Sequence, residues 1–269
     1  MKKTWVLALL GAVLAAALTG CSAQSENAQT NDAPALVIGI DGDYQPYSYL
    51  NDSGELVGVD IELAQEACRR MGYQAEHKAI QWDKKDDYLA DGSIDCVWSC
   101  FTYTGREDKY LWAGPYLYSR QVAVVKAGSE IADLPQLAGR SIAVMSSTKP
   151  EQILLSADGT EVPVPGELLS YATMDLAFTA MRRGYADAAA GHETVVRQLI
   201  GSMTEDYRIL STPLMTVQVG VAFPKDGDAA LAQKLTDTLA EMAEDGTTEE
   251  IVEKYGLDTA NVVRRDSID

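Results

Sequence analysis

Short apolar runs alternate along this chain with segments of helical periodicity, and this alternation limits its fold more than any other feature. An expected strand at residues 36–40 precedes a segment whose apolar positions recur at helical spacing, namely Ile61, Ala64, Cys68 and Met71. The next expected elements are a strand, a short helix and a strand, at residues 75–80, 83–91 and 94–98. Strands that alternate with helices imply a largely parallel sheet. The pattern therefore predicts an α/β unit.

A second set of alternating elements begins after the break at Ala127 and Gly128. Its expected strands and helices lie at residues 141–144, 148–155, 174–183 and 186–190. The chain ends with an expected strand at 217–223, a long helix marked by Leu231, Leu235, Leu239 and Met242 and stopped by Gly246, and a short helix through residues 251–255. Two copies of one α/β pattern predict a body with two lobes.

Composition and charge exclude several classes of function. The 269 residues are 46% hydrophobic and 23% charged, which is enough apolar sequence for a sizeable core. The formal net charge of -18 would repel phosphate backbones, so nucleic acid is not an expected partner. The sequence has no G-x-S-x-G motif and no P-loop motif. With only two histidines and no C-x-x-C pair, we expect no metal and no cofactor.

The first 35 residues have the features of an export signal and a tether. Lys2 and Lys3 precede an apolar run at residues 5–18, which is too short for an ordinary transmembrane helix. The following Leu-Thr-Gly-Cys sequence resembles a bacterial lipobox, which implies that residues 1–20 are removed and Cys21 is lipidated. The alternative is a plain signal peptide with an incidental cysteine. Residues 21–35 are predicted to be a flexible tether, so the protein would be extracytoplasmic and held to the membrane through its lipid only.

Aromatic and polar residues gather in the loops after the expected strands. Residues 41–47 read DGDYQPY, and a turn accounts for the Gly, Asp and Pro but not for Tyr44 and Tyr47, which suggest a contact surface or a lid over the core. Arg106 lies just inside an expected Thr-capped helix start, where the helix dipole favours an anion. Ligands of doubly wound sheets bind outside the carboxyl ends of the strands. These loops are therefore the predicted binding site.

A series of motifs in register resembles a known family. They are G-x-D-x-D-Y-x-P-Y, G-V-D-I-E-L-A, W-D, D-G-S-I-D, T-G-R, G-P-Y and the final D-G-T-x-x-x-I-x-x-K-Y-G. From about Leu36 to Gly256 their order and spacing are similar to the family 3 extracellular solute-binding proteins, the substrate-binding components of polar amino-acid ABC transporters.

The resemblance implies a type II periplasmic-binding-protein-like fold, in which two lobes of mostly parallel sheet flanked by helices are joined by two hinge strands. Residues 36–124 and 219–269 would form lobe one, and residues 125–218 lobe two. It also implies a monomer that captures a polar or cationic amino acid between closing lobes and delivers it to permease subunits. No enzymatic activity is expected.

The resemblance assigns binding roles by position. Arg106 would clamp the α-carboxylate of the ligand. Thr102 and the backbone at Cys100 would bind its head group, Tyr44 and Trp82 would sandwich its side chain, and Asp41 would meet a polar or cationic side chain. Thr148, with the amides of Ser147 and Lys149, would complete the carboxylate site at a helix N-terminus.

Some positions depart from the family pattern. Direct counting places His192 where the family carries the Asp that binds the α-ammonium, and a shift of one residue places Glu193 there. We favour Glu193, because an ammonium needs a negative acceptor and a neutral histidine offers one lone pair. Cys100 replaces a small residue, and only one residue separates Thr104 from Arg106 where many members have two.

Two other function classes remain as alternatives. A dehydratase of the same fold, acting on a prephenate-like acid, would need a general acid such as Asp41, Asp43 or Glu193. A ligand-sensing domain is the third class. Cys68 and Cys96 are expected to be buried free thiols, with a bridge between them as the alternative.

Overall fold

The computed structural model describes residues 33–263 and shows a two-lobed α/β fold. Its strands are β1 (Ala35–Ile40), β2 (Asp43–Tyr44), β3 (Ser48–Leu50), β4 (Leu56–Val57), β5 (Gln74–Ala79), β6 (Cys96–Val97), β7 (Leu111–Lys126), β8 (Ser141–Met145), β9 (Glu167–Tyr171), β10 (Ala188–His192), β11 (Tyr207–Ile209) and β12 (Met215–Phe223). Its α-helices are α1 (Val59–Met71), α2 (Lys85–Ala90), α3 (Lys149–Leu155), α4 (Met174–Arg183), α5 (Glu193–Gly201), α6 (Ala229–Glu244), α7 (Thr247–Lys254) and α8 (Thr259–Val262). Two 3-10 helices, η1 (Trp82–Lys84) and η2 (Leu134–Leu137), complete the set. The signal segment and Cys21 lie outside the described residues.

One mixed sheet runs in the order β5-β1-β6-β12-β7-β10-β8-β9, with β11 paired to β7. The β1–β5, β1–β6, β8–β9 and β8–β10 pairs are parallel, as the alternation of strands and helices predicts. The central β7 and β12 are different, because they are antiparallel to each other and to the strands beside them. The sheet thus consists of two parallel groups joined through an antiparallel pair.

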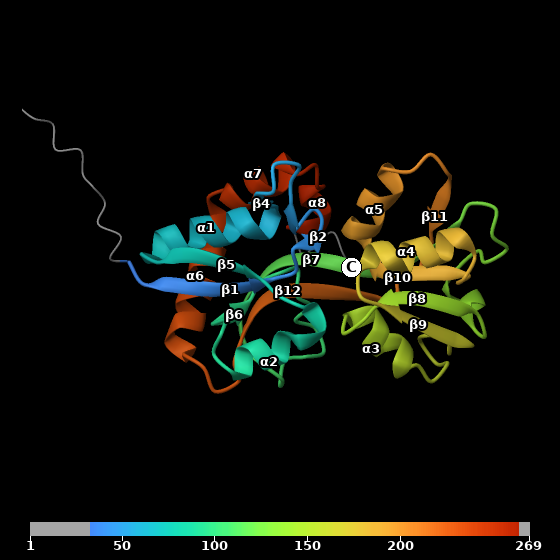
Figure 1. Cartoon of the computed structure of the whole chain (residues 1–269), viewed down its shortest axis with the longest axis horizontal. Helices are drawn as coiled ribbons and strands as arrows, with labels where there is room; N and C mark the ends of the chain where they lie inside the picture. Colours follow the sequence, from blue (N-terminus) through green and yellow to red (C-terminus); the bar gives the residue numbers. More distant parts are fainter. Residues whose placement is uncertain (1–32, 264–269) are drawn as a thin grey trace, which may run out of the picture. The chain divides into compact units, whose positions relative to one another are not determined.

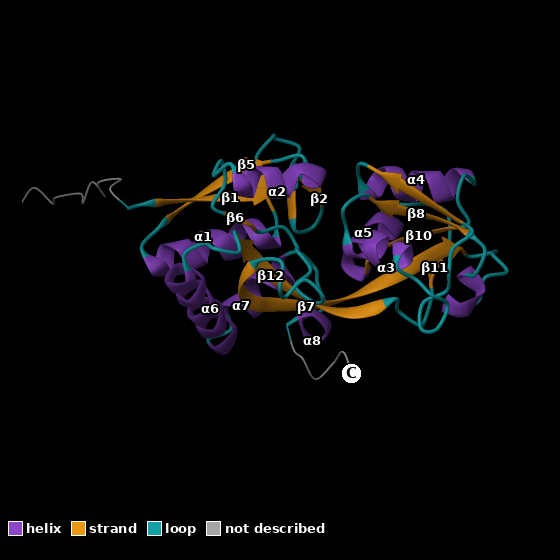
Figure 2. Cartoon of the chain, turned by 90° about the horizontal axis from the view of Figure 1, so that it is seen from below, coloured by secondary structure: helices purple, strands orange, loops and turns teal. Residues whose placement is uncertain are grey.

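Strands β7 and β12 link the two groups of elements. β7 is 16 residues long, and it pairs with β12 over most of the length of β12. In Figures 1 and 2 both strands pass from the group containing β1, β5 and α1 to the group containing β8, β10 and α4. β12 agrees with the strand expected at residues 217–223 to within two residues, whereas the long β7 was not predicted as a continuous strand.

Helices form where the apolar spacing predicted them. α1 buries the side that carries Ile61, Ala64 and Cys68, and it packs against β5 and α6. It starts after Gly58, whose φ of 137° only glycine adopts easily and where a Cβ would lie 2.1 Å from the carbonyl oxygen of Tyr47. In the other group, α4 packs against β8, β9 and β10, and the side chain of Thr173 caps its first turn.

The expected helix start around Arg106 is wrong. Residues 103–109 form turns, in which the amide of Arg106 donates to the carbonyl of Tyr103 at 3.0 Å and the amide of Lys109 donates to the carbonyl of Arg106 at 3.0 Å. Gly105 has a left-handed φ of 71°, which a helix cannot continue through. No helix dipole therefore acts at this position.

The cysteines of the described residues are free thiols, as expected. Cys68, Cys96 and Cys100 are all buried and unpaired. Within residues 33–263, no helix has the length and apolar character needed to cross a membrane. In the same range, no group of three His, Cys, Asp or Glu side chains is arranged to hold a metal ion.

Candidate functional site

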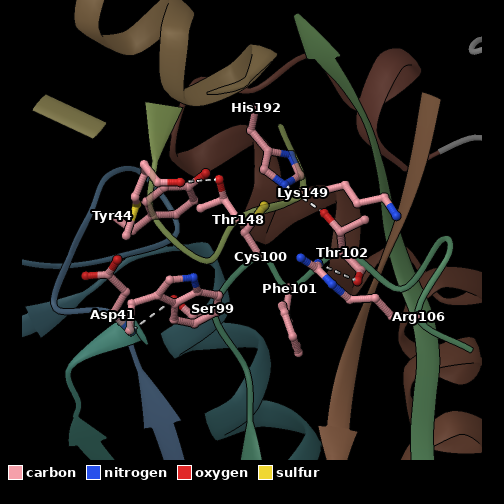
Figure 3. Close-up of a pocket in the computed structure, with 12 residues that line it drawn as sticks. Asp41, Tyr44, Ser99, Cys100, Phe101, Thr102, Arg106, Thr148, Lys149 and His192 are labelled. Carbon is pink, nitrogen blue, oxygen red and sulfur yellow. Dashed lines mark hydrogen bonds between the residues drawn. The ribbon is translucent and has the colours of Figure 1, made fainter. Parts of the chain in front are cut away.

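One pocket collects most of the residues that the sequence singled out. Figure 3 shows side chains from several loops pointing into it. The lining residues are Asp41, Tyr44, Trp82, Ser99, Cys100, Phe101, Thr102, Arg106, Met145, Thr148, Lys149 and His192. We call this cavity the central pocket. Of the predicted binding residues, Glu193 and Ser147 are absent from its lining.

The chain order explains how these residues meet. Asp41 follows β1, residues 99–106 follow β6, Met145 ends β8, and His192 ends β10. The carboxyl ends of parallel strands face the same edge of a sheet, so loops that are distant in sequence converge there. The central pocket lies where elements on both sides of β7 and β12 contribute side chains.

Arg106 is a partly buried cation in this pocket. One guanidinium nitrogen donates to the carbonyl oxygen of Thr102 at 3.2 Å, and the guanidinium carbon lies 5.0 Å from the ring centre of Phe101. Within residues 33–263 its side chain forms no ion pair with an acid. Burial lowers the pKa of Arg106, which means that the site disfavours its charge until an anion arrives. Such a group is suited to a carboxylate.

Lys149 brings a second cation to the same wall, and sequence reasoning missed its side chain. The residue is buried, and a Cβ at Gly105 would lie 2.5 Å from its Nζ. Its Nζ donates a long hydrogen bond of 3.5 Å to Oε1 of Gln152. Burial and the charge of Arg106 lower the pKa of Lys149. A lysine at the start of a helix usually faces solvent, so only the fold reveals its position.

His192 is buried in a network of neutral side chains. Its Nδ1 lies 3.1 Å from Oγ of Ser119, and its Nε2 lies 3.2 Å from Oγ1 of Thr102 and 3.0 Å from the amide nitrogen of Gln121. Both ring nitrogens of His192 therefore have side-chain hydrogen-bond partners. Burial and the charge of Arg106 lower the pKa of His192 to about 3. The imidazole is therefore neutral at physiological pH.

Glu193 does not face the central pocket, in contrast to our expectation. Its carboxylate accepts two hydrogen bonds from Arg120, at 2.6 and 2.8 Å, and two from Arg197, at 2.9 and 2.5 Å. These contacts lower its pKa despite its partial burial. Glu193 is the first residue of α5, one position beyond the end of β10, so its side chain points away from that of His192. Arg120 and Arg197 therefore pair with the carboxylate that was expected to bind the ammonium of the ligand.

Asp41 is the acid that lines the central pocket. Its Oδ1 accepts from the amide of Asp43 at 3.1 Å, and its own amide donates to Ser99 Oγ at 3.1 Å. Burial raises the pKa of Asp41 to about 6, and the nearby charge of Asp43 adds to the rise. In Figure 3 Asp41 and Arg106 lie on opposite sides of the view. The pocket thus has an acidic end and a basic end.

Aromatic rings separate these two ends. Tyr44 packs edge-on against His192 with ring centres 6.4 Å apart, and Trp82 packs edge-on against Phe101 at 5.3 Å. The indole nitrogen of Trp82 is buried and has no hydrogen-bond partner within residues 33–263. Tyr47 is fully buried and does not line the central pocket, so its role is in the core of the fold.

The remaining predicted donors are partly occupied. The amide of Cys100 donates to the buried carboxyl group of Asp60 at 2.6 Å, and Cys100 adopts a left-handed φ of 47°. Burial raises the pKa of the Cys100 thiol, so it stays protonated. The hydroxyl of Thr148 donates to the carbonyl of Met145, and the amide of Ser147 donates to Glu151 at 2.6 Å. These groups shape the pocket wall around Arg106 and Lys149.

Proteins similar to this chain bind amino acids, according to their names. The L-cystine-binding protein TcyJ of Escherichia coli K12 is 28% identical over 257 residues, which is 92% of this chain and 94% of that protein. The histidine-binding periplasmic protein of the same strain is 30% identical over 232 residues, or 81% of this chain and 86% of that protein.

Solved structures similar to this chain are also amino-acid-binding proteins, according to their descriptions. The crystal structure of Tv2483 bound to L-arginine has a TM-score of 0.74 and 32% identity, and the match covers 82% of this chain and 90% of the other. The ancestral amino-acid-binding protein AncCDT-1, described as a precursor of cyclohexadienyl dehydratase, has a TM-score of 0.73 and 25% identity, with coverage of 82% and 95%. The model of the bacterial extracellular solute-binding proteins, family 3, matches residues 36–258, and this chain is a member of that family.

Proposed function

We propose that this chain is the substrate-binding component of an amino-acid ABC transporter and that it captures a polar or cationic amino acid in the central pocket. The observation that carries the proposal is the partly buried guanidinium of Arg106, which has no ion-pair partner within residues 33–263 and shares the pocket wall with buried Lys149. Buried charges are costly without a partner, and a solute carboxylate supplies one. The names of its relatives, which include cystine-, histidine- and arginine-binding proteins, support an amino acid as the solute.

The proposed binding mode uses the two ends of the pocket. Arg106 holds the carboxylate in a bidentate contact, with Thr102 and the backbone near Cys100 and Thr148 around the head group. Tyr44 and Trp82 cover the side chain, and Asp41 meets its polar or cationic end. Residues 36–124 and 219–269 act as one lobe and residues 125–218 as the other, and the bound solute stabilises their closed arrangement. Permease subunits then receive the solute from a monomeric binding protein.

The proposal places the protein outside the cytoplasm on a lipid anchor. The family is extracellular by description, and Cys21 ends a lipobox-like sequence after an uncharged apolar run. Residues 21–35 then serve as the tether between the lipid and the folded body. The membrane is contacted through the lipid only.

A dehydratase is the second candidate function, because one similar structure is described as a precursor of such an enzyme. Of the acids considered as a general acid, Asp41 lines the central pocket, whereas Asp43 and Glu193 do not. The fully saturated pairing of Glu193 with two arginines also argues against proton transfer there. Transport without catalysis is therefore the proposal.

Thermal-shift measurements on the protein from residue 22 onward, with α-amino acids, ω-amino acids and prephenate, test this proposal. A ligand that binds only the folded state raises the melting temperature by mass action. We expect at least one amino acid to raise it and to be recovered unchanged. No shift with any amino acid, or consumption of prephenate, would contradict the proposal.

A further inference from the structure

The central pocket lacks the acceptor that an α-ammonium group needs. Glu193, the acid expected to supply it, is held by Arg120 and Arg197 outside the pocket. His192 stands at the end of β10 instead, and both of its ring nitrogens are engaged by Ser119, Thr102 and Gln121. A neutral imidazole whose one lone pair is already in a hydrogen bond cannot accept a further hydrogen bond from an ammonium.

The positive charges of Arg106 and Lys149 disfavour the binding of an ammonium group in this part of the pocket. Arg106 and Lys149 are close enough that the charge of Arg106 lowers the pKa of Lys149 and of His192. Neither cation has an ion-pair partner within residues 33–263. A solute carboxylate bound here would place its own α-carbon beside both cations. An ammonium on that carbon would add a third positive charge beside Arg106 and Lys149, where the only acids within electrostatic range among the described residues, Asp86 and Glu107, do not line the pocket.

A cation is instead favoured at the other end of the pocket. Asp41 is buried, and Figure 3 shows it across the pocket from Arg106. The buried carboxylate is thus separated from Arg106 and Lys149. Between the ends lie the rings of Tyr44 and Trp82, together with Phe101 and Met145. Such a lining suits uncharged methylene groups.

We infer that the solute is an ω-amino or ω-guanidino acid, in which Arg106 and Lys149 bind the carboxylate, Asp41 binds the distant cation, and the carbon beside the carboxylate is uncharged. The inference rests on the proposed function, because it requires that Arg106 binds a solute carboxylate. It narrows that function from amino acids in general to those whose positive charge lies far from the carboxylate. The unpaired side-chain oxygen of Gln121 does not change this assignment, since Gln121 does not line the pocket.

Calorimetric titration of the full chain in detergent with matched pairs of compounds tests the inference. Each pair differs only by the α-ammonium: 4-aminobutanoate and 2,4-diaminobutanoate, 5-aminopentanoate and ornithine, 6-aminohexanoate and lysine, 5-guanidinopentanoate and arginine. One of these pairs should bind most tightly, because the length of its carbon chain matches the pocket. In that pair we expect the compound without the α-ammonium to bind at least about tenfold more tightly than its partner, a difference of about 1.4 kcal/mol.

Two variants of His192 make the test specific. His192→Asp introduces a carboxylate beside Arg106, so the α-amino compound of the same pair should gain affinity and reverse the preference. The matched control His192→Asn is neutral, so it should keep the wild-type preference. If His192→Asp fails to fold, two measurements still test the inference. The wild-type protein should prefer the compound without the α-ammonium, and Asp41→Asn should lose affinity for that compound.

The outcomes separate the inference from the proposed function. The inference is wrong, and the proposed function stands, in either of two cases. In the first, the wild-type protein binds the α-amino acid of a pair more tightly than the matched compound without the α-ammonium. In the second, it binds none of these pairs but binds another α-amino acid. If no carboxylate binds at all, both are wrong. Tighter binding of the ω-compounds, reversed by His192→Asp, supports the inference.

Discussion

The Nε2 of His192, at the end of β10, lies 3.2 Å from Oγ1 of Thr102, in the loop between β6 and β7. This contact joins two segments that are 90 residues apart in the chain. The imidazole at this contact is neutral, because burial and the charge of Arg106 lower its pKa to about 3. A position suited to an acid is thus held by an uncharged hydrogen-bonding side chain.

Protonation of His192 should make the protein less stable in acid. The folded-state pKa of about 3 is below the ordinary histidine value of 6.5, so the unfolded state binds more protons between these pH values. The contribution of His192 to the free energy of unfolding should therefore rise as pH increases from about 3 to 6.5, by at most about 1.4 kcal/mol per pH unit. Chemical denaturation of wild type and His192→Asn at pH 4, 5, 6 and 7 measures this difference.

The comparison with the variant is needed because other buried groups act in the opposite direction. Burial raises the pKa of Asp41 to about 6 and that of Asp60 to about 7, so these acids favour the folded state at low pH. Both acids remain in His192→Asn. If the two proteins have parallel pH profiles, the imidazole is not neutral in the folded state.

Asp41 should make the binding of a cationic solute depend on pH. Its pKa of about 6 means that the carboxylate is largely protonated at pH 5 and ionised at pH 7. Affinity for a solute with a cationic end should rise about tenfold over this interval, since only the ionised form attracts the cation. Asp41→Asn should bind more weakly at pH 7 and should lose the dependence. Calorimetry at both pH values would contradict the assignment if the variant kept the wild-type profile.

Glu193→Gln should affect stability more than binding. Its carboxylate is 14% exposed and joins Arg120 to Arg197, so its loss removes two ion pairs at the start of α5. Such partly exposed pairs contribute about 1 kcal/mol or less each. Affinity should stay within about threefold, a change below 1 kcal/mol. A large loss of affinity with an unchanged melting temperature would show instead that Glu193 contacts the solute.

Cys21→Ser should release the protein from the membrane. Cys21 lies outside the described residues, and the prediction rests on the lipobox-like sequence before it. Fractionation of cells that express each form measures the effect, with Cys68→Ser as the control for a buried thiol. A Cys21→Ser protein that remains in the membrane fraction after a salt wash would show that no lipid anchor is needed.

Local periodicity predicted the elements of the fold well because it reflects which face is buried. α1, α4 and α6 lie where the apolar spacing placed them, and β1 and β8 follow the short apolar runs. Loop order also brought Asp41 and Arg106 into one pocket, since both follow strands of the same sheet. These features depend on neighbours in the sequence or on sheet topology.

Side-chain partners could not be predicted in this way. Glu193 meets Arg120, 73 residues earlier, because β10 pairs with β7 in a specific register. Lys149 enters the pocket because α3 begins beside Gly105, which leaves space for its ammonium. Both outcomes depend on distances between elements, and no local pattern in the sequence encodes those distances.

Arg106→Ala tests the central claim most directly. Removing the guanidinium leaves the solute carboxylate without its bidentate partner, and the expected loss is on the order of 2 to 5 kcal/mol of binding free energy. The ligand found by thermal shift should be titrated by calorimetry into wild type, Arg106→Ala and Arg69→Ala, in which an exposed arginine on α1 is the matched control. The account predicts lost binding in Arg106→Ala alone, with circular dichroism and melting close to wild type. Affinity within a few-fold of wild type would show that the carboxylate is held elsewhere and would contradict the account.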